Sequence, residues 1–161
     1  MKPMQKESIM NETHDVDLLN EGLQGEYFAI TAYDAALGTG LLSAKVTTVA
    51  KGFQADHRAH AQAISEAIER LRERASAPKT WKEYAAMYPP PKLASETDVL
   101  QYAASLERAA AVADTKMVAR ILDPALRTLF ARIGGVESMH WALLRSTLGE
   151  APIPDSFIPS D

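Results

Sequence analysis

The stretch that decides the fold is "RIGGVESMHWALL", residues 132–144. Within it, Ile133, Glu137, His140 and Leu144 follow one another at intervals of four, three and four residues. Such intervals place side chains on one face of an α-helix, and an apolar face of this kind packs into a core. A glutamate and a histidine in the middle of that face therefore need an explanation, and the rest of the chain repeats the pattern.

Glycine and proline divide the chain into four long segments without sustained two-residue alternation, so we predict an all-α fold. The expected helices span residues 15–37, 43–75, 96–122 and 124–148. Ser43 and Asp123 are suitable N-cap residues, and Pro124 and Gly149 suit a helix start and a helix end. The expected domain layout is a loosely ordered tail over 1–14, a four-helix bundle over 15–149 with a linker at 76–95, and a proline-rich tail over 150–161.

Composition narrows the classes of protein. The 161 residues suit one domain, and 47% hydrophobic with 24% charged residues is ordinary for a globular protein. A net charge of -4 argues against a nucleic-acid partner, and no apolar run is long enough for a membrane span. We expect a cytoplasmic protein without a signal peptide. Because cysteine is absent, any metal must be held by histidine, aspartate or glutamate.

Every expected helix carries an apolar stripe that glutamate or histidine interrupts near its middle. The interrupting residues are Glu26, His57, His60, Glu107, Glu137 and His140. In two antiparallel hairpins these residues would come level, because their distances from the chain breaks differ by only a few residues of about 1.5 Å rise each. Each half of the chain contains one helix with a single glutamate and one helix with an i, i+3 pair, which we interpret as a structural duplication.

Taken singly, each polar residue could be a hydrogen-bonded core residue or lie at a solvent-facing edge. Taken together, three carboxylates buried at one level would repel each other and lose hydration, unless cations lie among them. Di-metal bundles use one glutamate from each of two helices and a Glu-x-x-His pair from each of the others. The i, i+3 spacing lets both side chains reach one ion. The pattern therefore predicts a metal site.

Four stretches resemble the ferritin-like superfamily, in particular the small bacterial ferritin-like domain proteins related to rubrerythrin. They are "LQGEYFAITAY", "FQADHRAH", "SLERAAAV" and "GVESMHWALLRSTLGEAPIPDSF", and the resemblance covers about residues 15–157. It implies that Glu26, His60 and Glu107 occupy ligand positions and that Tyr33 is the family's tyrosine. The chain departs from the family at His57-x-x-His60, where Glu-x-x-His is usual, so three carboxylates remain to balance the ions.

The resemblance implies two divalent ions, iron foremost, although glutamate and histidine also suit manganese or zinc. It implies an oxidoreductase of ferroxidase or peroxidase type, which oxidises Fe(II) or reduces O2 or peroxide. Tyr33 would then supply an electron or a hydrogen bond. Asp114 is expected to accept a hydrogen bond from a ligand histidine, or else to lie at an exposed helix edge. Asp56, beside His57 in sequence, is a further candidate for such a contact.

Two other classes stay open: a homodimeric scaffold in which zinc or manganese is structural, and a hydroxylase that would need an apolar channel to the metals. A DNA-protecting mini-ferritin is less expected because no basic tail is visible, and nothing identifies the contacts of a storage cage. We expect a homodimer. The linker is long enough to run the length of a bundle, which favours a ferritin-type crossover. Its aromatic residues are expected to pack over the bundle.

Overall fold

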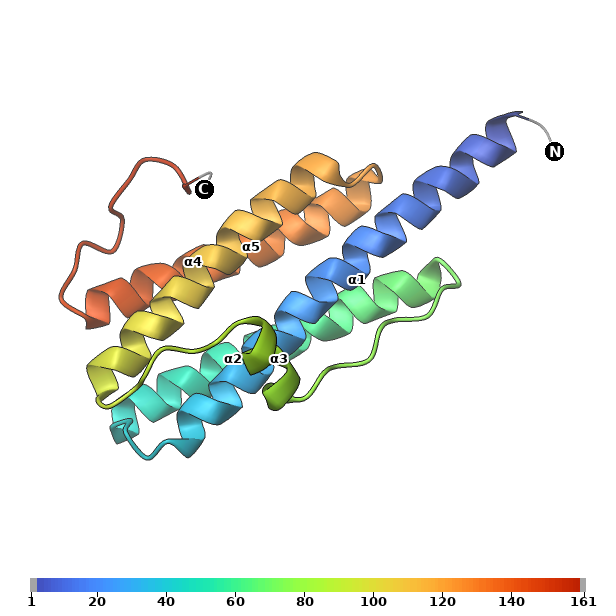
Figure 1. Cartoon of the computed structure of the whole chain (residues 1–161). Coiled ribbons are helices and arrows are strands. Elements are labelled where there is room, and N and C mark those ends of the chain that lie inside the picture. Colours follow the sequence, from blue (N-terminus) through green and yellow to red (C-terminus); the bar gives the residue numbers. More distant parts are fainter. Residues whose placement is uncertain (1–2, 160–161) are drawn as a thin grey trace.

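The helices of the computed structural model form two hairpins. The structure describes residues 3–159, with side chains from Thr13 onward. Its helices are α1 (Pro3–Gly38), α2 (Ala44–Arg70), α3 (Trp81–Met87), α4 (Glu96–Arg120) and α5 (Pro124–Thr147). Helix α1 packs mainly against α2, and α4 against α5, each pair joined by a short connection (Figure 1). The predicted all-α bundle is confirmed. None of the described helices is long and apolar enough to cross a membrane.

A long crossover joins the hairpins. After α2 the chain runs back along the bundle and enters α4 close to where α2 begins (Figure 1). At that end the backbone N–H of Ser43, just before α2, donates a hydrogen bond to the carboxylate of Glu96, the first residue of α4. Helices α2 and α4 therefore start at the same end of the bundle and run in the same direction, as the ferritin-type crossover requires.

Side-chain caps fix the starts of three long helices. Ser43 accepts a hydrogen bond from the backbone N–H of Val46, and Ser95 accepts one from Asp98. The carboxylate of Asp123 accepts from two backbone N–H groups of the first turn of α5, where Pro124 follows. Each cap satisfies donors that the first turn of a helix leaves unpaired. These starts lie within one residue of the predicted ones.

Two helix boundaries and one additional helix differ from the prediction. Helix α1 begins at Pro3, so most of the expected N-terminal tail is helical, while residues 1–2 lie outside the described range. No glycine interrupts the chain before Gly22, and extending an existing helix costs less than nucleating one. Helix α2 ends at Arg70, five residues early, because Arg72 adopts a positive φ of 61°. The N–H of Glu73 then donates to the carbonyl of Ile68, which closes the helix end without a glycine.

The third difference is α3, a short helix within the expected linker. Thr80 and Glu83 form a capping box, in which each side chain binds the other's backbone N–H. Tyr84 from this helix is buried, and its ring and those of Trp81 and Tyr88 pack around Phe28 of α1. The expectation that the aromatic linker packs over the bundle is confirmed.

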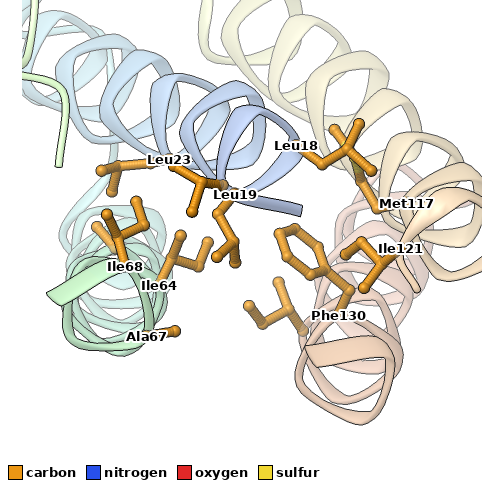
Figure 2. Close-up of a cluster of buried hydrophobic side chains, with 12 residues drawn as sticks. Leu18, Leu19, Leu23, Ile64, Ala67, Ile68, Met117, Ile121 and Phe130 are labelled. Carbon is orange, nitrogen blue, oxygen red and sulfur yellow. The ribbon is translucent and has the colours of Figure 1, made fainter. Parts of the chain in front are cut away.

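The core consists of two apolar clusters separated along the bundle. The first includes Leu19, Leu23, Ile64 and Phe130, which point toward one another between the helices in Figure 2. The second lies nearer the Ser43 end and includes Tyr33, Phe53, Leu100 and Leu144. On every long helix the interrupting polar residues fall between the residues of the two clusters. The polar layer is therefore enclosed between two apolar layers.

Candidate metal centre

The six predicted polar residues meet in the layer between the apolar clusters. Helix α1 contributes Glu26, α2 contributes His57 and His60, α4 contributes Glu107, and α5 contributes Glu137 and His140. All are buried except His60, which is partly exposed. Glu137 has an exposed fraction of 0%. The i, i+3 pairs on α2 and α5 therefore face each other and the single glutamates of α1 and α4.

His57 connects the two hairpins. Its Nδ1 lies 2.8 Å from Oε2 of Glu26 in its own hairpin, and its Nε2 lies 3.3 Å from Oε1 of Glu107 in the other. Its Nδ1 is also 3.5 Å from Oε1 of Glu137. The imidazole of His57 thus lies at the centre of the cluster.

The cluster divides into two overlapping groups, each with ligand atoms within 4.8 Å of one another. One group contains Glu26, His57, His60 and Glu137, and the other contains His57, Glu107, Glu137 and His140. Oε1 of Glu137 lies 2.9 Å from Nδ1 of His60, and its Oε2 lies 3.4 Å from Nδ1 of His140. The two oxygens of Glu137 therefore face different groups, and each group could use one of them as a ligand.

Several of these buried polar atoms make no hydrogen bond. Both carboxylate oxygens of Glu137 and Nδ1 of His60 are enclosed but receive or donate no hydrogen bond among the side chains described. Leaving such groups unsatisfied costs free energy, more so for a charged one. A metal ion accepts electron pairs from carboxylate oxygens and imidazole nitrogens, so the donors present fit a divalent cation in each group.

Without metal, the cluster neutralises itself by protonating its histidines. Burial alone would lower the pKa of His57, but hydrogen bonds with Glu107 and Glu26 outweigh it and raise the pKa to about 11. His60 and His140 behave alike: neighbouring glutamates overcome the effect of burial and raise each pKa to about 9. At neutral pH three imidazolium groups therefore face three glutamates.

The pKa values of Glu107 and Glu137 shift in opposite directions in this cluster. Burial tends to raise the pKa of Glu107, yet its bonds with His140 and His57 hold the pKa well below its ordinary value. Burial raises the pKa of Glu137, and the nearby His140 and His60 oppose this effect without cancelling it.

Tyr33 lies against this cluster. Its hydroxyl donates a hydrogen bond to Oε1 of Glu107, the oxygen that also faces His57. Burial, followed by the negative charge of Glu107, raises the pKa of Tyr33 well above its ordinary value. The phenol therefore keeps its proton and acts as a hydrogen-bond donor to a candidate ligand.

Asp56 reaches the cluster from outside. Its side chain is 54% exposed, yet its Oδ2 lies 3.1 Å from Nε2 of His140. The other nitrogen of this ring, Nδ1, faces Glu107 and Glu137. Asp56 thus orients His140 so that Nδ1 points inward, which is the carboxylate–histidine arrangement found behind metal ligands.

Asp114 is buried, so the alternative of an exposed helix edge was wrong. It fits there because Gly134 carries no side chain: a Cβ on Gly134 would lie 2.9 Å from Cβ of Asp114. No hydrogen bond joins Asp114 to a histidine among the described side chains, and its Oδ2 has no partner. Burial, then the charges of Glu26 and Glu137, raises its pKa to about 8. Asp114 is therefore mostly protonated at neutral pH.

Comparison with known proteins agrees with this geometry. Residues 14–150 match the model of the ferritin-like domain family, and the chain belongs to that family. The fold is also similar to the crystal structure of a conserved hypothetical protein, rv2844, from Mycobacterium tuberculosis, with a TM-score of 0.74 and 18% sequence identity. The similarity covers 91% of this chain and 99% of that one, and at this identity it concerns the fold alone. No curated protein matches the chain.

Proposed function

We propose that this ferritin-like domain holds two divalent metal ions, iron foremost, and oxidises Fe(II) with O2 or peroxide as the acceptor. The ligands would be Glu26, His57 and His60 in one hairpin and Glu107, Glu137 and His140 in the other. The observation that carries the proposal is Glu137, whose two buried oxygens lack hydrogen bonds and face the two overlapping ligand groups.

Iron bound in these groups would supply the electrons that O2 or peroxide accepts. The protein itself balances the charge of the ions and orients the ligand side chains. The three glutamates offset positive charge in an enclosed layer, and the histidines lose their protons on binding. Asp56 holds His140 with Nδ1 inward, and Tyr33 donates to Glu107 while keeping its own proton. The apolar clusters on both sides restrict water.

The test is metal content per chain by elemental analysis, after expression in medium supplemented with iron, manganese or zinc. We expect two ions per chain in the wild type. Glu137→Gln keeps the size of the side chain but weakens a ligand shared by both groups, so the content should fall below one. Glu66→Gln, an exposed position on α2, is the control and should keep two ions.

If iron is found, oxygen or peroxide consumption with added Fe(II) is the second measurement. The proposal expects turnover in the wild type and in Glu66→Gln, and little in Glu137→Gln. A wild type without metal under all three conditions, or a Glu137→Gln variant with unchanged content, would refute the two-metal site.

A structural metal in a homodimer is the second candidate function. It is favoured by His57, which leaves three carboxylates instead of four for two divalent ions. This reading expects zinc or manganese to raise the melting temperature without any oxidase activity, and sedimentation to show a dimer. Iron turnover in a monomer would exclude it.

A further inference from the structure

An apolar cavity lies at the Ser43 end of the bundle, beside the metal centre. Its volume is about 210 Å3, and its wall is formed by residues from α1, α2, α4 and α5. Most of the lining is aliphatic, including Val46, Val49, Leu100 and Leu144. A well-packed core leaves few voids larger than a water molecule. A cavity of this size is therefore a candidate ligand-binding site.

The lining changes character from its outer to its inner end. The exposed lining residues, Ser43, Lys45 and Thr147, are polar, whereas the inner ones, such as Ala50 and Leu100, are buried and apolar. Among the described lining side chains Lys45 is the one cation and Glu96 the one carboxylate. The carboxylate of Glu96 accepts a hydrogen bond from the backbone N–H of Ser43, which leaves the ammonium group of Lys45 available to a ligand. A matching ligand would have an apolar body and an anionic end.

The inner end of the cavity touches the metal centre through two aromatic rings. Tyr33 lines the cavity and donates to Glu107. Phe53 also lines it and stacks on His140, with ring centroids 3.8 Å apart and planes inclined by 19°. A ligand in the cavity would therefore press against the side chains that support two candidate ligands.

We propose that this cavity binds an aliphatic monocarboxylate, with its hydrocarbon chain inside and its carboxylate at Lys45. The volume, the aliphatic wall and the charge at the mouth carry this inference together. It does not depend on metal in the neighbouring site, because all the lining residues come from the folded bundle itself.

The first experiment is calorimetric titration of the full chain with butanoate, octanoate and dodecanoate, below micelle-forming concentrations. Each methylene buried in the cavity should tighten binding by about fourfold. The gain should stop once the chain fills the cavity. The titration is run on metal-free and metal-loaded protein, so that loss of metal and loss of chain binding are seen separately.

Variants then locate the binding. Ala103→Phe on α4 and Val49→Phe on α2 fill the cavity from opposite walls and should weaken dodecanoate binding by about fifteenfold or more, equal to two excluded methylenes. Ala113→Phe, exposed on α4, is the matched control and should bind as the wild type does. Lys45→Gln should weaken dodecanoate but leave dodecanol unchanged. Circular dichroism checks that each variant folds.

A photoreactive dodecanoate gives a result that needs no variant: it should label peptides containing residues 32–36, 42–53, 96–106 or 144–147, which line the cavity. The proposal is overturned if dodecanoate does not bind saturably, if labelling falls elsewhere, or if Ala103→Phe and Ala113→Phe bind equally. It is also overturned if Ala103→Phe dissociates a dimer while dodecanoate has no effect, because a second copy would then fill the cavity.

Discussion

At the scale of single residues, His57 links the two hairpins at the polar layer. A glutamate at this position would add a fourth carboxylate to three that already lie close together. The imidazole instead contacts Glu26 with one nitrogen and Glu107 with the other, and so joins the two hairpins. Replacing a charge by a neutral ligand lowers the total negative charge available to metal. This favours ions that accept nitrogen donors readily.

Asp56 provides a prediction at the same scale. Asp56→Asn removes a charged acceptor from Nε2 of His140, and contacts of this kind change metal affinity by about 10- to 100-fold. We expect a loss in that range, measured by competition with a chromogenic chelator. The matched control is Asp34→Asn, an exposed aspartate on α1 that contacts Gln54 and Arg58. Equal affinities in the two variants would show that Asp56 does not support the ligand.

At the scale of the elements, close approach between helices depends on glycine. Gly22 of α1 faces Phe130 of α5, a residue of the apolar cluster in Figure 2. A Cβ on Gly22 would lie 2.6 and 2.7 Å from two ring carbons of Phe130, whose ring is fully buried and cannot withdraw. Gly25, three residues later, has open space around it.

This difference predicts opposite effects of one substitution. Gly22→Ala should lower the free energy of unfolding by about 1–3 kcal/mol, because the core is overpacked. Gly25→Ala should raise it by about 0.5–1 kcal/mol, because alanine is the better residue in a helix. Urea denaturation of the two metal-free variants measures both. Stabilisation by both substitutions would mean that α1 and α5 are not in contact here.

The element scale also shows what the sequence could and could not predict. Long stripes with helical spacing located α1, α2, α4 and α5, and the caps Ser43 and Asp123 located the starts of α2 and α5. The "TWKE" stretch at 80–83 carried the capping-box signal for α3, which we missed among prolines. The end of α2 had no such signal, because Arg72 takes a conformation usually left to glycine.

The site, like the helices, was predictable only where the sequence carries a local signal. The six polar residues were found because they interrupt apolar stripes, and the structure brings all six together. The contact of Asp56 with His140 could only be guessed, because it depends on how α2 and α5 are placed against each other. The apolar cavity could not be predicted from the sequence either, because its lining residues do not differ in type from ordinary core residues.

At the scale of the whole molecule, the protonated histidines couple stability to pH. Their pKa values, about 9 to 11, lie above the ordinary value of 6.5, so the folded metal-free chain binds more protons than the unfolded one above pH 6.5. Their stabilising effect is complete below that pH and is lost as pH rises toward the folded values. For His57 alone the loss is about 1.4 kcal/mol per pH unit.

We therefore expect the melting temperature of the metal-free protein to fall steadily between pH 6.5 and 9. The raised pKa of Asp114, about 8, acts in the same direction up to that pH. Metal-loaded protein should lose less stability or gain it, because ions replace the protons. Asp114→Asn should flatten the metal-free profile in part. A metal-free melting temperature that rises with pH would contradict the assigned protonation.

The crossover has a consequence for how the chain could be divided. Its first part is hydrogen-bonded to α1, through Ser76 to Asn20 and through Tyr84 and Lys79 to Gln24. Three consecutive prolines, residues 89–91, follow between α3 and α4. Two peptides cut at this triple proline would each carry three of the six proposed ligands. Mixed in a chelating buffer they should associate weakly, and with added iron or zinc they should assemble, as sedimentation would show. In the intact chain, metal would then act as a second connection between the hairpins, beside the covalent one.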